Sequence, residues 1–131
     1  MFGDSMLKHI DAERTKDIDI ANNICKSIQT AQETYQNATI HYSPIIPKYD
    51  NKNIKRSDTI NNIVKTFCKF KGNSFNYIDT RPLFVKNDTI RFDRLAKDKL
   101  HLNRTGIFAM AKHLKYAIHA VEKTPPPPYS P

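Results

Sequence analysis

The sequence predicts an α/β fold built on a parallel sheet, and three observations lead to that prediction. Apolar residues recur at helical spacing in three segments, and two short runs between those segments are rich in β-branched and aromatic residues. The order along the chain is helix, strand, helix, strand, helix, which is typical of parallel strands joined by right-handed crossovers. At 131 residues with 39% hydrophobic content, the chain is long enough for one globular domain.

The first predicted helix and strand occupy the first third of the chain. The helix runs from Asp17 to about Tyr35, and Asp17 and Asp19 suit the positive end of its dipole. Its apolar face is formed by Ile18, Ala21, Ile24, Cys25, Ile28, Ala31 and Tyr35. Residues 38–47 then read as a short buried strand that Pro44 and Pro47 end.

The second helix and strand follow the same order. Ser57 and Asp58 are suitable N-terminal caps for a helix that Gly72 would terminate. Its apolar stripe consists of Ile60, Ile63, Val64 and Phe67. Residues 75–79 form the second predicted strand, and a charged loop with a proline leads from it to the last helix. One face of that last helix carries Ile107, Met110, Ala111, Leu114, Ile118 and Val121.

The charge and the cysteines bear on partners and on location. The net charge is +8 and the pI about 9.5, which favours polyanions such as nucleic acid or an anionic lipid surface, although a solvated lysine-rich surface gives the same totals. Cys25 and Cys68 fall on helical stripes, so they read as small buried side chains in a reducing, cytoplasmic environment. The sequence shows neither a signal peptide nor an apolar run of membrane-spanning length.

Asp98 and His101 form the clearest candidate for catalytic chemistry. They lie three residues apart just before the last helix, and such spacing lets an aspartate fold back onto the neighbouring imidazole. A carboxylate in that place fixes the histidine tautomer and stabilises the imidazolium that forms when histidine takes a proton. The alternative is that Asp98 caps a turn and His101 is an ordinary surface histidine.

Two blocks of the sequence resemble the SGNH (GDSL-type) hydrolases. Gly3-Asp4-Ser5 resembles their first block, and "DKLHLNRTG" at residues 98–106 resembles their last, an Asp-x-x-His followed by glycine and a helix. "ATIHYSPIIPKYD" is similar to the family's fourth strand and its loop, and residues 57–80 to the next helix and strand. The resemblance spans about residues 1–5 and 17–121.

The resemblance implies a three-layer α/β/α, flavodoxin-like sandwich with a serine esterase site acting on a small acyl ester. Ser5 would be the nucleophile and oxyanion donor, His101 the general base and Asp98 its orienting partner. The chain departs from the pattern near residues 6–16, which hold neither the glycine nor the Gly-x-Asn-Asp of the second and third blocks. The domain, residues 1–121, is therefore expected to be truncated and internally shortened. We expect the domain to descend from an esterase and this chain to show weak or no ester hydrolysis.

The alternative to an enzyme is a binding module that uses its charge or its tail, and a separate expectation concerns self-association. Residues 122–131 form a proline-rich tail expected to be flexible, in which Pro126, Pro127 and Tyr129 fit the Pro-Pro-x-Tyr ligand of WW domains. Basic residues around Tyr49 could meet nucleic-acid phosphates: Lys48, Lys52, Lys55 and Arg56. A sheet with so few strands should expose an apolar edge and favour self-association. No metal or cofactor motif occurs.

Overall fold

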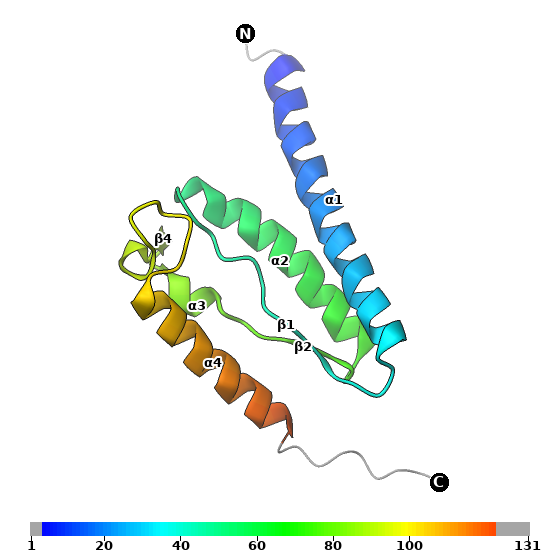
Figure 1. The fold of residues 1–131 in the computed structure, drawn as a ribbon. Helices are drawn as coiled ribbons and strands as arrows, with labels where there is room; N and C mark the ends of the chain where they lie inside the picture. The colour runs from blue at the N-terminus through cyan, green and yellow to red at the C-terminus, as the bar shows by residue number, and fades with distance from the viewer. Residues whose placement is uncertain (1–3, 123–131) are drawn as a thin grey trace.

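The computed structural model describes the backbone of residues 4–122 and the side chains of residues 14–122. The elements in chain order are α1 (Asp4–Thr34), β1 (Ile40–Tyr42), α2 (Lys52–Lys71), β2 (Phe75–Tyr77), α3 (Arg81–Phe84), β3 (Val85–Lys86), β4 (Thr89–Ile90), the 3₁₀ turn η1 (Phe92–Arg94) and α4 (Arg104–Glu122) (Figure 1).

The predicted parallel pairing is confirmed. β1 and β2 pair in parallel with Ile40 opposite Phe75 and Tyr42 opposite Tyr77, and α2 is the crossover between them. Among the described residues this sheet has two strands, and a separate two-stranded sheet joins β3 to β4. The structure is therefore a mixed α/β fold around a small parallel sheet, and the full flavodoxin-like sandwich stays a prediction.

The first two helices are longer than the sequence pattern indicated. α1 begins at Asp4 rather than Asp17, so residues 6–16 are helical, and the first turns of α1 extend beyond the other elements (Figure 1). Asp17 is consequently inside a helix, where it is only 5% exposed and binds the Arg56 guanidinium on α2. The predicted interaction of Asp17 with the dipole of its own helix is therefore replaced by an ion pair with Arg56 of α2.

The predicted N-terminal caps of α2 are wrong. The helix begins at Lys52, and Asn51 occupies the capping position. Ser57 is buried inside the helix, and Asp58 binds Arg81. The extra turn forms because Ile54 packs into a small core with Val85, Ile90 and Leu95. Those three residues lie outside α2, so the pattern within the helix could not predict the contact. Gly72, with φ of 84°, ends the helix as predicted.

The main core lies between α1, α2 and the two parallel strands. Its buried members are Ala21, Ile28, Ile60, Val64, Cys68 and Phe75. Cys68 is buried, Cys25 is half-buried against this cluster, and both are free thiols whose pKa values burial raises. The two cysteines thus behave as small core side chains, as the sequence predicted.

A hairpin that the sequence pattern did not indicate lies between β2 and α4. Asn87 and Asp88 connect β3 to β4, and both have positive φ, at 53° and 57°. That pair of dihedrals is typical of a type I′ turn, which asparagine and aspartate tolerate better than most residues. The Asn-Asp dipeptide was the available signal for it.

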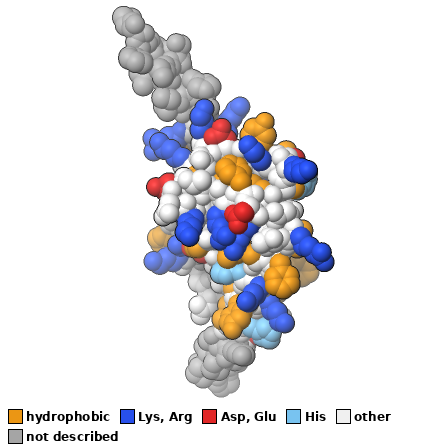
Figure 2. All heavy atoms as spheres, turned by 90° about the vertical axis from the view of Figure 1, so that its left-hand side faces the viewer, with side chains coloured by type: hydrophobic (Ala, Val, Ile, Leu, Met, Phe, Trp, Pro, Cys, Tyr) orange, Lys and Arg blue, Asp and Glu red, His pale blue; other side chains and the backbone are white. Residues whose placement is uncertain are grey.

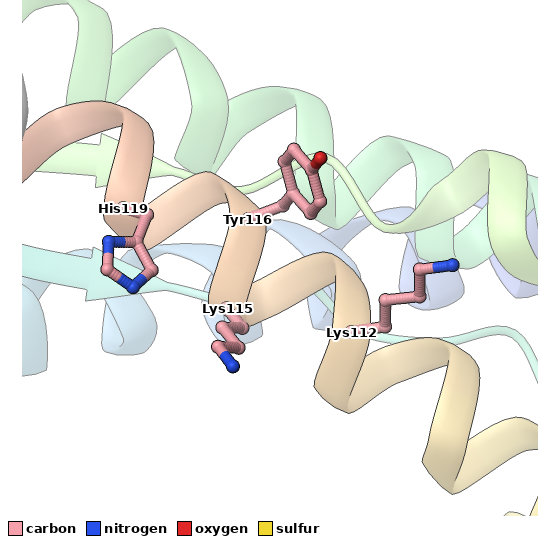
Figure 3. Close-up of a pocket in the computed structure, with 4 residues that line it drawn as sticks. All are labelled: Lys112, Lys115, Tyr116 and His119. Atoms are coloured by element: carbon pink, nitrogen blue, oxygen red, sulfur yellow. The ribbon is translucent and has the colours of Figure 1, made fainter.

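α4 lies in front of the two parallel strands, with α1 and α2 behind them (Figure 3). Its N-terminal end packs on η1 and α3, and Gly106 is its one buried residue. Met110, Leu114, Ile118 and Val121 of the predicted stripe are half-buried, whereas Ile107 and Ala111 are exposed. Lys and Arg side chains are spread over the visible surface (Figure 2). None of the described helices is long and apolar enough to cross a membrane.

Candidate active site

The turn at residues 96–101 is organised around the carboxylate of Asp98. Its Oδ1 accepts hydrogen bonds from the backbone N–H groups of Leu100 and His101, at 2.9 and 3.1 Å. Lys99, between Asp98 and Leu100, adopts a positive φ of 59°. The chain therefore reverses within four residues, and the reversal brings the His101 ring back over the aspartate.

The second carboxylate oxygen completes the pair that the sequence predicted. Asp98 Oδ2 lies 2.5 Å from Nδ1 of His101, which is the position of an N–H donated to a carboxylate. Hydrogen bonds from the His101 ring and then from the two backbone N–H groups hold the pKa of Asp98 well below its usual range. With Nδ1 engaged, the neutral ring presents Nε2 as its proton acceptor.

The pair is open to solvent rather than enclosed. The side chain of His101 is 80% exposed and that of Asp98 is 45% exposed. Water therefore reaches both groups, and the carboxylate–imidazole contact is worth less than it would be in a dry site. The arrangement can orient an imidazole and accept a proton. It does not by itself exclude water from a reacting centre.

A polar framework ties this turn to the start of α4. The backbone N–H of Ala96 donates to the carbonyl of His101 at 2.8 Å, next to a bridge between Leu95 and Leu102. The Asn103 amide donates to the carbonyls of Asp93 and Leu95, and its Oδ1 accepts the Gly106 N–H at 2.9 Å. Asn103 is thus the N-cap of α4 as well as a brace for the loop.

Asn103 is a structural residue of the candidate site that the pattern of the last block did not single out. An asparagine directly before a helix is a good capping signal, so it could have been recognised from the sequence. What could not be recognised is its second role, because the carbonyls it braces belong to a loop eight and ten residues earlier.

A shallow hollow of about 250 Å³ lies beside the turn. Its lining residues are Ile45, Ile46, Lys48, Tyr49, Asn53, Arg56, Ser57, Ile60 and Leu100. Tyr49 takes a positive φ of 73°, unusual for a bulky residue, and its N–H donates to the Lys99 carbonyl at 2.9 Å. This strained contact couples the segment after β1 to the turn that holds Asp98 and His101.

The predicted basic group around Tyr49 is only partly a loop. Lys52, Lys55 and Arg56 lie on the first turns of α2, and Arg56 binds Asp17 at 2.9 Å. Lys48 and Tyr49 remain in the segment between β1 and α2. The basic residues are therefore divided between the rim of the hollow and the exposed side of a helix.

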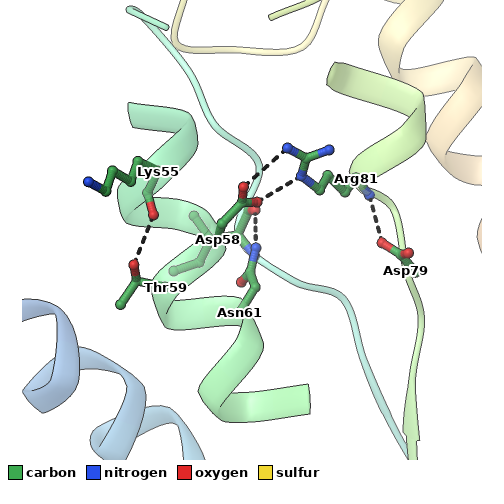
Figure 4. A network of polar contacts seen from close by, with 7 residues as sticks. Lys55, Asp58, Thr59, Asn61, Asp79 and Arg81 are labelled. Carbon is green, nitrogen blue, oxygen red and sulfur yellow. Dashed lines mark hydrogen bonds and ion pairs between the residues drawn. The ribbon is translucent and has the colours of Figure 1, made fainter. Parts of the chain in front are cut away.

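Side chains from α2 fix the segments that leave both parallel strands. Asn61 accepts the N–H of Ile45 and donates to its carbonyl, at 2.9 and 2.8 Å. Asp58 accepts two hydrogen bonds from Arg81, at 2.8 and 3.1 Å, and Asp79 accepts the Arg81 N–H (Figure 4). The carboxyl edge of the sheet is where α/β folds place chemistry, and these clamps hold it in a defined shape.

The remaining predicted site residues are not brought into this picture. Ser5 falls in the first turn of α1, where the structure describes the backbone alone, so its pairing with His101 stays a prediction. Pro126, Pro127 and Tyr129 lie outside the described residues, and the WW-domain motif also stays a prediction.

Comparison with known proteins gives a fold relationship. No family model and no curated protein sequence matches the chain. Among solved structures, it is similar to the esterase domain of the ORF1 protein from the zebrafish ZfL2-1 retrotransposon, with a TM-score of 0.66 and 20% sequence identity. The match covers 79% of this chain and 60% of that one, so this chain spans less than two thirds of that domain. The chain is therefore similar in fold to part of an esterase domain.

Proposed function

We propose that this chain is an SGNH-type serine esterase-like domain acting on small acyl esters. The observation that carries the proposal is the Asp98–His101 contact, because it places an oriented imidazole in the loop before α4. The similarity in fold to an esterase domain supports the same assignment. Ser5 is the proposed nucleophile, His101 the general base and Asp98 the residue that positions it.

The proposed reaction is an acyl transfer through Ser5. Nε2 of His101 takes the hydroxyl proton as Oγ bonds to the acyl carbon, and the same proton then leaves with the alcohol as the ester C–O bond breaks. Water, deprotonated by His101, attacks the acyl-enzyme and releases the acid and Ser5. The chain holds neither sequence block that supplies the family's two further oxyanion donors. Since each is worth roughly 100- to 1,000-fold, we expect turnover roughly 10⁴- to 10⁶-fold below that of a complete site.

The test combines slow hydrolysis with covalent trapping on the full chain. In Ser5→Ala and in His101→Ala, the rate of p-nitrophenyl butyrate hydrolysis should fall to the rate seen without a working site. A fluorophosphonate should form an adduct on Ser5, found by peptide mass spectrometry, and His101→Ala should lose that adduct.

His119→Ala is the matched control, because exposed imidazoles hydrolyse activated esters without any site. His119 is also exposed but lies on α4, away from the Asp98 turn. An equal loss of hydrolysis in His119→Ala, or an adduct on serines other than Ser5, would contradict the proposal.

A nucleic-acid-binding module is the second candidate, and the outer stripe of α4 favours it. Lys112, Lys115, Tyr116 and His119 line a hollow of about 400 Å³ along this helix (Figure 3). Tyr116 is 76% exposed, and an exposed aromatic ring beside lysines suits base stacking combined with phosphate contacts.

Two double variants separate this stripe from the basic start of α2. Lys112→Ala with Lys115→Ala should weaken single-stranded RNA binding. The slope of the logarithm of the dissociation constant against the logarithm of salt concentration should also fall, by the amount expected for about two lost phosphate contacts. Lys52→Ala with Lys55→Ala removes the same charge elsewhere and should have the smaller effect. Equal effects would mean that net charge alone binds RNA, and no binding at low salt would remove this candidate.

A further inference from the structure

Within the described residues each strand of the main sheet has one open edge, and the edge of β1 is the one that lies beside an apolar groove. Among the described residues, β1 has β2 as its one neighbouring strand. Ile40 donates its N–H to the Ser74 carbonyl, and Tyr42 accepts the N–H of Ile78, so these two residues face β2. Because adjacent residues of a strand direct their backbone groups to opposite sides, the N–H and C=O of His41 face the open edge.

An uncharged groove runs beside this edge. It has a volume of about 540 Å³ and lies between α1 and β1. Its lining residues are Ile20, Asn23, Ile24, Ser27, Ile28, Ala31, Ile40 and Tyr42. The chain has 26% charged residues and a net charge of +8, yet the described lining of this groove holds no Lys, Arg, Asp or Glu. Edge strands are commonly protected by lysines or prolines, and neither occurs within β1.

We propose that this surface binds the same surface of a second copy of the chain. β1 would pair antiparallel with β1 of the second copy around a two-fold axis at His41. In that arrangement the N–H of each His41 donates to the carbonyl of the other. A four-stranded sheet, β2-β1-β1-β2, would result, with the two apolar grooves facing each other behind it.

Symmetry and charge favour a second copy over a foreign strand. An antiparallel pair centred on one residue is self-complementary when both backbone groups of that residue face outward, which is the arrangement at His41. Ile40 and Tyr42 then oppose each other across the axis, on the face that carries the groove. Two strongly cationic molecules also meet here without bringing lysine or arginine side chains of the groove together. A two-stranded sheet gains stability as further strands are added.

Sedimentation velocity of the full chain over a range of concentrations tests the proposal. The wild type should show a concentration-dependent monomer–dimer equilibrium. Ile20→Glu places a charge in the groove at a residue that is 39% exposed, and His41→Pro removes the outward N–H while leaving the backbone bonds to β2. Each should raise the dimer dissociation constant by about 10-fold or more. Both His41→Pro and His41→Ala lose the contact between the His41 ring and the Asn76 amide at 3.1 Å, so comparing the two isolates the backbone N–H.

Matched controls separate this surface from others. Ile107→Glu makes the same substitution on α4, at a side chain that is 57% exposed, and His41→Ala keeps the backbone N–H. Both should dimerise like the wild type, and circular dichroism should show the same helix content in all variants. A monomeric wild type, open-ended aggregates in place of dimers, or equal weakening by Ile107→Glu would overturn the proposal.

Disulfide trapping tests the register. In the proposed pair the two His41 Cα atoms lie about 5.5 Å apart, within the range a disulfide spans. In a Cys25→Ala background, His41→Cys should therefore form a covalent dimer on mild oxidation. Asn76→Cys is the control, since Asn76 lies opposite His41 on β2 and its mate would be three strand spacings away. Efficient crosslinking through residue 76 would contradict the β1–β1 pairing.

Discussion

Gly106, beside the candidate site, is a position where a side chain does not fit. A Cβ atom built at this position would lie 2.2 Å from the Arg94 carbonyl oxygen, which is backbone and cannot move aside cheaply. We predict that Gly106→Ala lowers the free energy of unfolding by about 3 kcal/mol, the upper end for overpacking. Urea unfolding measures it. Thr105→Ala, at an exposed neighbouring position, should change stability by less than about 0.5 kcal/mol, and a similarly small effect at Gly106 would disprove the close approach.

Tyr42 and Tyr77 give the molecule a defined sensitivity to alkali. Their rings lie 5.9 Å apart, and burial raises the pKa of Tyr42 from 10.0 to about 12 and raises that of Tyr77 as well. The unfolded chain therefore loses these protons first, so their contribution is complete below pH 10 and is lost as pH rises from there towards 12. Urea midpoints measured from pH 9 to 12 should fall steeply in the wild type.

The phenylalanine variants isolate the tyrosine contribution. Tyr42→Phe combined with Tyr77→Phe should flatten the fall in midpoint, leaving the smaller part that the thiols of Cys25 and Cys68 contribute, since burial raises the pKa of both. Tyr116→Phe, at a tyrosine that is 76% exposed, should retain the wild-type profile. Identical profiles for the double variant and the wild type would show that these hydroxyls ionise equally easily in both states.

Contacts between side chains a few residues apart in the sequence were the part of the site that could be predicted. The contact between Asp98 and His101 needs only a turn, and that turn is built from the same residues. The partners of Tyr49 and Asn103 could not be predicted in this way, because each bonds a segment set by tertiary packing. Ser5 is the extreme case, since its role depends on a pairing across nearly the whole chain.

At the scale of elements, the type of element was predictable and its start was not. The apolar stripes identified α1, α2 and α4, and the β-branched runs identified β1 and β2, since both signals are periodic. The starts failed because Asp17 and Ser57 resemble caps but lie inside helices. Asp17 is neutralised by Arg56 from another helix, a contact that no local pattern contains.

A polar contact from His113 ties the second half of α4 to the segment after β2. Gly106 is its one buried residue, and His113 donates from Nε2 to the Asp79 carbonyl at 2.8 Å, beyond the end of β2. We predict that His113→Ala speeds amide hydrogen exchange in the second half of α4 by about 5-fold, as expected for one lost hydrogen bond of about 1 kcal/mol. Exchange in α2 should not change. His119→Ala, on the exposed side of the same helix, should leave α4 unaffected, and uniform acceleration in both variants would refute the anchor.

At the scale of the whole molecule, burial of the core stabilises the fold, whereas repulsion within the net positive charge destabilises it. The main core joins α1 and α2 to the two strands, whereas the net charge of +8 is spread over a small surface. Two ion pairs offset some of that repulsion locally. Asp17–Arg56 joins α1 to α2, and Asp58–Arg81 joins α2 to α3. They are part-exposed pairs, so salt weakens them only modestly, while it screens the long-range repulsion among the many lysines.

Screening should therefore win, and we predict that the urea midpoint rises as NaCl increases from about 10 to about 150 mM. Lys112→Glu with Lys115→Glu exchanges two positive charges for two negative ones on exposed positions of α4. Because that variant starts with less self-repulsion, its midpoint at low salt should be higher and its dependence on NaCl flatter. Lys112→Gln with Lys115→Gln should fall between the two. A midpoint that falls with salt in the wild type would mean that the ion pairs, and not the net charge, dominate the electrostatics of this fold.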